Sequence, residues 1–145
     1  MLKQELEKHN LHFDELFYER CEKFTLLLKE WGKVHNLTSL NSLHDSDIKK
    51  NIVDSLYPLG FMDEFNSFAD IGTGAGYPGL ILAIAKPNIK AVLIEPRVKR
   101  VAFLNYVKNI LGLKEELTIA ELVDYKIVEF GEYRNYLYIE NRSEK

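Results

Sequence analysis

The 145-residue sequence lacks several features that would place a protein in a class at once. It has a single cysteine, so no internal disulfide can form, and this usage fits a reducing compartment. No apolar run approaches the roughly 18 residues that a membrane span needs. The start, Met-Leu-Lys-Gln-Glu, has no apolar signal region. We therefore expect a cytoplasmic protein with no membrane partner.

An excess of positive charge is also missing. The formal net charge of −3 argues against a protein that coats nucleic acid generally, although it is compatible with a local basic patch. In contrast, 46% hydrophobic and 12% aromatic residues can form a real core, which argues against global disorder. The length predicts one domain over residues 1–145, and we expect a monomer.

The most informative stretch is Ser67–Gly79, which has the pattern of a short buried strand, a tight turn and a helix start. Gly72, Gly74 and Gly76 stand at alternate positions, where the missing Cβ lets the backbone turn sharply and approach a ligand. Pro78 suits a first helical turn, since its missing N–H would be unpaired there anyway. The stretch therefore predicts a ligand-binding loop between a strand and a helix.

Two ligands compete for this loop. Gly74-Ala-Gly76-Tyr-Pro-Gly79, with Glu95 downstream, satisfies the dinucleotide fingerprint. Asp70-Ile-Gly72-Thr-Gly74-Ala-Gly76 resembles the acid-x-G-x-G-x-G signature of S-adenosylmethionine (SAM) enzymes, and it also accounts for Asp70 and Gly72. A carboxylate at this place suits the ammonium of a methionine moiety and would repel a pyrophosphate. SAM is therefore favoured over a dinucleotide, and a glycine turn without ligand is the third alternative.

A second buried strand is predicted at Lys90–Glu95, and it also ends in a carboxylate. Ligands of a doubly wound sheet lie beyond the carboxyl ends of the strands, so Asp70 and Glu95 should converge on one crevice. Glu95 could accept both ribose hydroxyls, or it could be a surface glutamate at a strand end. The predicted cofactor-binding residues are Asp70, Gly72, Thr73, Gly74, Gly76, Tyr77, Pro78 and Glu95.

Three longer helices are predicted. The first covers about Asp14 to Val34, with an apolar stripe in which Cys21 is a core residue rather than a nucleophile. The second starts near Asp45 or Ser46, either of which could cap it. The third runs from Arg97 to about Leu111, buries Val98 among others, and ends at Gly112.

Four motifs together carry a family resemblance. They are Trp31-Gly-Lys-Val-His-Asn-Leu-Thr-Ser39, Asn51-Ile-Val-Asp-Ser-Leu56, Ala69-Asp-Ile-Gly-Thr-Gly-Ala-Gly-Tyr-Pro-Gly79 and Glu95-Pro-Arg-Val-Lys-Arg-Val-Ala-Phe-Leu104. In order and spacing, over residues from about 20 to 114, they resemble the bacterial ribosomal RNA small-subunit methyltransferase G family, also called the glucose-inhibited-division protein B family.

The resemblance implies an α/β fold of the class I SAM-methyltransferase type, with a Rossmann-like doubly wound sheet. Residues 1–62 would be a helical N-terminal extension and residues 63–145 the SAM-binding part. The implied activity is methyl transfer from SAM to N7 of a guanine in 16S ribosomal RNA, with the rRNA or the small ribosomal subunit as partner. Guanine N7 already carries a lone pair, so alignment can supply much of the catalysis, and we predict no catalytic base and no metal.

The third helix begins with a cluster of cations that could be a solvated face or could meet RNA phosphates. Asp54 is either a solvated or capping residue or part of the pocket wall. The predicted RNA-contacting residues are Lys33, Asn36, Asp54, Arg97, Lys99, Arg100 and Lys108. Two alternatives to the methyltransferase remain, namely a non-catalytic SAM- or nucleotide-binding module and, more weakly, a nicotinamide-dependent oxidoreductase.

The C-terminal third departs from the family pattern. Between Glu116 and Asp124 there is no room for the strand and helix segments that the family has there, so we expect a missing block and an incomplete C-terminal part. Tyr125–Phe130 and Arg134–Ile139 alternate like the two strands of an antiparallel hairpin. We expect either a chain break near residues 116–124 or a sheet in which the Ser67–Ile71 strand has an open edge.

Overall fold

The computed structural model describes residues 2–35, 43–113, 116–121 and 137–140. Their elements are α1 (Leu2–Lys8), α2 (Glu15–His35), α3 (Asp45–Leu56), the 3-10 helix η2 (Tyr57–Gly60), β1 (Ser67–Ile71), α4 (Gly79–Ala85), β2 (Lys90–Glu95), α5 (Val98–Leu111), β3 (Leu117–Glu121) and β4 (Leu137–Glu140). The fold class is α/β with a Rossmann-like parallel sheet, as predicted. Among the described helices, none is long and apolar enough to cross a membrane.

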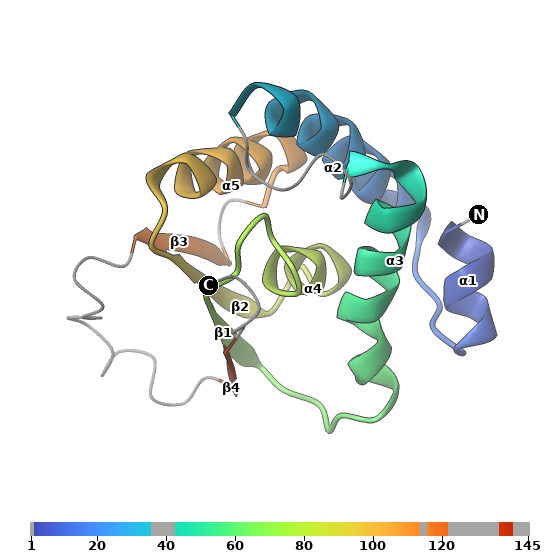
Figure 1. The fold of residues 1–145 in the computed structure, drawn as a ribbon. Helices are drawn as coiled ribbons and strands as arrows, with labels where there is room; N and C mark the ends of the chain where they lie inside the picture. Colours follow the sequence, from blue (N-terminus) through green and yellow to red (C-terminus); the bar gives the residue numbers. More distant parts are fainter. Residues whose placement is uncertain (1, 36–42, 114–115, 122–136, 141–145) are drawn as a thin grey trace.

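The sheet has the strand order β3-β2-β1-β4, and each neighbouring pair is parallel (Figure 1). In β1 and β2 the bounds are those predicted, because both segments are mainly apolar and have a carboxylate at or next to their last residue. Asp70 pairs with Leu93 in this register. The carboxyl ends of the two strands, and therefore Asp70 and Glu95, lie at one edge of the sheet.

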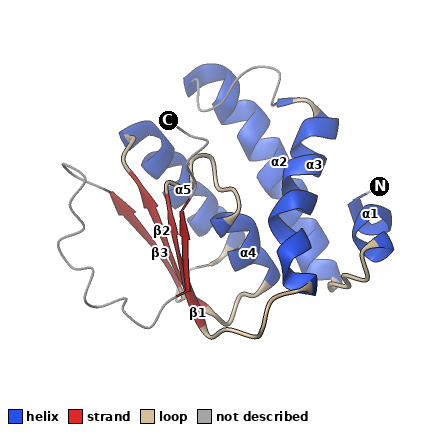
Figure 2. Ribbon diagram, turned by 60° about the horizontal axis from the view of Figure 1, so that its bottom comes forward, coloured by secondary structure: helices blue, strands red, loops and turns tan. Residues whose placement is uncertain are grey.

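The described helices form a layer on one face of the sheet, with α4 and α5 against the strands and α2 and α3 outside them (Figure 2). In helix α4, every residue except the last, Ala85, is buried. Phe24 and Leu28 of α2 reach the same core as Phe103 and Leu104 of α5. Tyr77, in the loop between β1 and α4, packs against this core.

Local signals explain where the helices begin and end. The Asp14 side chain accepts a hydrogen bond from the Phe17 N–H (2.9 Å) and so caps α2. Gly112 ends α5 with φ of 72°, a left-handed conformation that suits glycine. The expected cap of α3 is wrong, because its N-cap is His44 and makes no side-chain hydrogen bond, while Asp45 already lies in the first turn.

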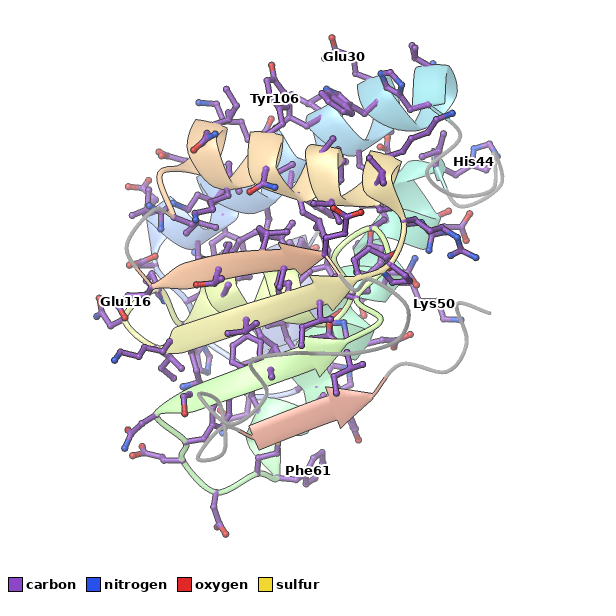
Figure 3. The ribbon with its side chains drawn as sticks, turned by 90° about the vertical axis from the view of Figure 1, so that its left-hand side faces the viewer. Glu30, His44, Lys50, Phe61, Tyr106 and Glu116 are labelled. Atoms are coloured by element: carbon purple, nitrogen blue, oxygen red, sulfur yellow. The ribbon has the colours of Figure 1, made fainter. Side chains whose placement is uncertain are left out.

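Val98, which was expected in the core, is 65% exposed in the first turn of α5. Val34, the predicted end of the first helix, is 75% exposed in the last turn of α2. Cys21, in contrast, is buried as predicted, and burial raises the pKa of its thiol to about 12. Tyr106 of α5 stacks on Trp31 of α2 at 5.1 Å and remains 40% exposed on the outer surface (Figure 3).

The expected open edge of β1 is wrong. Strand β4 pairs with β1 in parallel, with Phe68 opposite Leu137 and Ile71 opposite Glu140. The segment predicted as the second strand of an antiparallel hairpin contains β4, which pairs in parallel with β1 and satisfies backbone groups of that edge. The antiparallel pairing of this segment with Tyr125–Phe130 stays a prediction. Tyr125–Phe130 lies outside the described residues, and so do residues 122–124, so the chain break stays a prediction.

Candidate functional site

The glycine-rich loop leaves β1 at its carboxyl end and is tied to the neighbouring strand. The N–H groups of Gly72 and Thr73 donate to the Ile94 carbonyl oxygen at 2.8 and 3.3 Å. Gly72, Gly74 and Gly76 have φ values of 80°, 62° and 119°, so the loop needs the left-handed region at each of the three positions named by the sequence motif. The loop is therefore held at the ends of β1 and β2 together.

Asp70 lies beneath this loop with no exposed surface. Its Oδ2 accepts a hydrogen bond from the Gly79 N–H at 2.8 Å, which links the end of β1 to the start of α4. Burial raises the pKa of Asp70 to about 6, and the nearby charge of Glu95 adds to this, whereas Thr73 and the Gly79 N–H oppose it. Asp70 is therefore an integral part of the loop's support.

Two polar atoms at this place lack a protein partner. Within the described part of the chain, Asp70 Oδ1 and Thr73 Oγ1 are both buried without a hydrogen bond. The Thr73 hydroxyl is near enough to influence the pKa of Asp70, yet the geometry between the two side chains does not reach a hydrogen bond. Buried polar atoms are nearly always paired, so a polar ligand group that met these two atoms would satisfy them.

Glu95 is 1% exposed, which rules out the alternative of a surface glutamate. Its Oε1 accepts a hydrogen bond from the Gly74 N–H (3.0 Å), and its Oε2 accepts one from the Arg97 N–H (2.7 Å). The Arg100 guanidinium lies 4.0 Å from Oε1. The sequence placed Asp70 and Glu95 in one crevice, and the structure brings both under the same loop.

Tyr77 and Pro78 form the exit of the loop. The Tyr77 ring packs edge-on against Phe24 of α2 at a centroid distance of 5.8 Å, and burial raises the pKa of its hydroxyl. Asn51 of α3 lies near enough to this hydroxyl to oppose the rise. Asn51 was not predicted as a site residue, although its spacing of four residues from Ser55 places it on the buried side of α3.

The predicted RNA-contacting residues divide into groups. Arg97 and Lys99 are exposed beside the carboxyl ends of the strands, Lys33 is exposed in the last turn of α2, and Lys108 is half-buried in the last turn of α5. Arg100 does not share this exposure, because its side chain is turned toward Glu95 and only 14% exposed. Asp54 is exposed on α3, and Asn36 lies outside the described residues.

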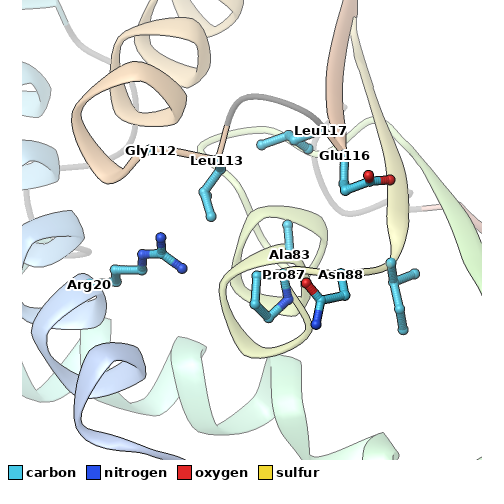
Figure 4. Close-up of a pocket in the computed structure, with 9 residues that line it drawn as sticks. Arg20, Ala83, Pro87, Asn88, Gly112, Leu113, Glu116 and Leu117 are labelled. Atoms are coloured by element: carbon cyan, nitrogen blue, oxygen red, sulfur yellow. The ribbon is translucent and has the colours of Figure 1, made fainter.

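A pocket of about 380 Å³ lies at the opposite, amino-terminal edge of the sheet (Figure 4). Its lining includes Arg20, Asn88 and Glu116, and Glu116 stands just before β3, far along the strands from their carboxyl ends (Figure 3). This pocket includes neither Asp70 nor Glu95, so it is not the predicted crevice. The described residues contain no group of three His, Cys, Asp or Glu side chains placed to hold a metal ion.

Known proteins with similar sequences agree on one family. The family model GidB, described as rRNA small subunit methyltransferase G, matches residues 18–135. Proteins named ribosomal RNA small subunit methyltransferase G are similar to the chain: that of Aliarcobacter butzleri is 56% identical over 124 residues, covering 86% of this chain and 63% of its own length. That of Wolinella succinogenes is 46% identical over 128 residues, covering 88% and 65%, and that of Helicobacter pylori strain 26695 is 44% identical over 106 residues, covering 72% and 58%.

The chain thus spans somewhat less than two thirds of the length of these curated relatives. The family match includes all the described strands except β4, the whole glycine-rich loop and both buried carboxylates. Its extent and the identity to these relatives lead to one conclusion. The chain belongs to the GidB family, whose description is rRNA small subunit methyltransferase G.

Proposed function

We propose that the protein binds SAM at the carboxyl ends of β1 and β2 and transfers its methyl group to N7 of a guanine in 16S ribosomal RNA. The observation that carries the proposal is the loop geometry: three left-handed glycines lie between two buried carboxylates, Asp70 and Glu95. Membership of the GidB family supports the same reaction class. A ribosomal substrate would place the protein in the cytoplasm.

The residues at the site fit the two polar ends of SAM. A carboxylate has about four lone-pair positions, and the Gly74 and Arg97 N–H groups use two of those on Glu95. The others are available to ribose hydroxyls. Asp70 Oδ1 and Thr73 Oγ1, which lack partners among the described residues, suit the ammonium and carboxylate of the methionine moiety. Gly72, Gly76, Tyr77 and Pro78 complete the predicted set of cofactor-binding residues.

The chemical demands on the protein are small. Bound SAM supplies an electrophilic methyl group, and guanine N7 supplies its own lone pair, so the residues here only bind, orient and exclude water. Precise alignment of this kind contributes roughly 7–11 kcal/mol in favourable cases. We propose that Arg97, Lys99, Lys33 and Lys108 bind RNA phosphates, with Asn36 and Asp54 near the entering base. None of these side chains needs to accept a proton.

Calorimetric titration tests the cofactor class directly. We expect SAM and S-adenosylhomocysteine to bind, and NAD and NADP to fail, because Asp70 would repel a pyrophosphate. Binding of NAD in preference to SAM would instead support an oxidoreductase.

A second assay separates an enzyme from a binding module. Transfer of a labelled methyl group is measured with a 16S rRNA transcript and with small ribosomal subunits, and the product is digested to locate the label. Methylation at guanine N7 is the expected result. SAM binding without transfer to either substrate would show that the chain is a non-catalytic module.

We also propose that residues 1–145 act as one monomeric domain, with residues 1–62 as a helical extension of the SAM-binding part. The expected missing block between residues 116 and 124 is compatible with the greater length of the relatives. If the natural protein contains this block, its intact mass will exceed the 16.9 kDa of the present sequence. A measured mass equal to 16.9 kDa would contradict the missing block.

A further inference from the structure

Arg100 differs from the cations next to it in the sequence. It lies in the first turn of α5, directly after the exposed residues Val98 and Lys99. Its own side chain is only 14% exposed, and its Nη1 lies 4.0 Å from Glu95 Oε1. A side chain oriented toward a buried carboxylate is poorly placed to meet an RNA phosphate on the surface at the same time.

Glu95 is held by groups from two parts of the chain, the glycine-rich loop and the start of α5. The Gly74 N–H of the glycine-rich loop and the Arg100 guanidinium of α5 approach the same oxygen, Oε1. The Arg97 N–H, in the turn before α5, binds Oε2. An ionised carboxylate that is 1% exposed is costly unless it is paired and hydrogen-bonded, and Arg100 is the positive charge that an ion pair requires.

We infer that Arg100 is a positioning residue of the cofactor site: it fixes the Glu95 carboxylate so that its free lone pairs face the ribose hydroxyls. This inference rests on the proposed function and names a new role within that site. It replaces the expectation that Arg100 contacts RNA phosphate. The role depends on the fixed, planar guanidinium, which offers several N–H donors in one plane. Arg100 acts on the ligand only through Glu95.

Ribose selectivity provides a readout that a merely structural role would not change. The affinity for S-adenosylhomocysteine and for its 2′-deoxyribose analogue is measured by calorimetry for the wild type and for Arg100→Ala. We expect the wild type to prefer the natural ligand by about tenfold or more, as hydrogen bonds to a charged acceptor imply. Arg100→Ala should lose about fivefold to tenfold in affinity for S-adenosylhomocysteine and much of this preference.

Lys99→Ala is the matched control, because it removes an exposed cation one residue away. It should leave both the affinity and the ribose preference unchanged, while reducing the salt dependence of 16S rRNA binding. Arg100→Lys should restore only part of the preference, since lysine keeps the charge but not the planar donors. In a Glu95→Gln background, Arg100→Ala should have little further effect on ligand binding, because the two residues act as a unit.

A measurement without cofactor tests the same contact. Hydrogen exchange of the Gly74 amide reports on its hydrogen bond to Glu95. We expect Arg100→Ala to speed this exchange by about fivefold or more and Lys99→Ala to leave it unchanged. Should Arg100→Ala fail to fold, Arg100→Gln, which keeps most of the side-chain volume, takes its place in every comparison, and thermal unfolding monitors each variant.

Two results would overturn the inference. One is an Arg100→Ala variant that keeps its ribose preference and its Gly74 protection. The other is an Arg100→Ala variant whose salt dependence of rRNA binding falls as in Lys99→Ala, because Arg100 would then be a phosphate contact. If the wild type binds no S-adenosylhomocysteine, the proposed function itself fails, and the exchange of the Gly74 amide alone still decides whether Arg100 fixes Glu95.

Discussion

Gly79→Ala should strongly destabilise the protein, although alanine normally favours a helix. Gly79 is the first residue of α4, and an added Cβ would lie 2.6 Å from Asp70 Oδ2 and 2.8 Å from Asp70 Cβ, with Leu93 closer still. Its N–H also donates to Asp70 Oδ2, which is fully buried. The substitution therefore forces apart the link between β1 and α4.

The size of the effect follows from three contributions. Replacing glycine with alanine in an open helix stabilises by about 1 kcal/mol. Overpacking at a tight site costs about 1–3 kcal/mol. Weakening the hydrogen bond to a buried carboxylate costs about 1–3 kcal/mol more. The unfavourable contributions exceed the favourable one, so the free energy of unfolding should fall on the order of 2–4 kcal/mol.

Urea denaturation at neutral pH measures this change, with Gly60→Ala as the control. An added Cβ at Gly60 meets nothing within 4 Å, and this glycine lies outside the left-handed region. Gly60→Ala should therefore be neutral or stabilise by about 0.5 kcal/mol. The slope of the unfolding free energy against urea should stay constant in both variants. A Gly79→Ala variant as stable as Gly60→Ala would refute the role assigned to Asp70.

Three further predictions concern the site. SAM binding, measured by calorimetry, should weaken at least tenfold in Gly74→Val and in Glu95→Gln. Gly74→Val puts a branched side chain at a φ of 62°. Unchanged affinity in both variants would contradict the site. Arg97→Ala and Lys99→Ala should each lower the slope of log K against log salt for 16S rRNA binding by about 1, and neither should change the affinity for SAM. An equal loss of SAM binding would instead place these residues in the cofactor site. Asp70 binds its proton more tightly in the folded protein, with a pKa near 6 against 3.8, so its ionisation lowers the stability of the folded state as the pH rises from about 4 to 6. From pH 4 to pH 7.5, the free energy of unfolding of Asp70→Asn should therefore rise by about 2 kcal/mol relative to that of the wild type, as measured by thermal unfolding. A difference between the two proteins that does not change with pH would contradict this.

The strand–loop–helix core of the site was predictable because its signals are local. The apolar runs of β1 and β2 give their bounds directly, and the glycine spacing names the three positions that need a left-handed φ. The end of α5 at Gly112 follows from the same conformational freedom. Helix α1 has no comparable signal in its seven residues, since Leu6 becomes a core residue only when α1 packs against α3.

Long-range contacts decided the features of the fold and of the site that the sequence did not predict. By itself the sequence determined the family, the α/β class and the presence of two carboxylates at strand ends, because apolar period, glycine placement and motif spacing are properties of neighbouring residues. The tertiary structure alone decided that β4 pairs in parallel with β1. It also separated Arg100 from Lys99, which look alike in the sequence as cations at the start of one helix. Only the packing of α5 beside β2 turns one side chain to a buried carboxylate at 4.0 Å and leaves the other in solvent.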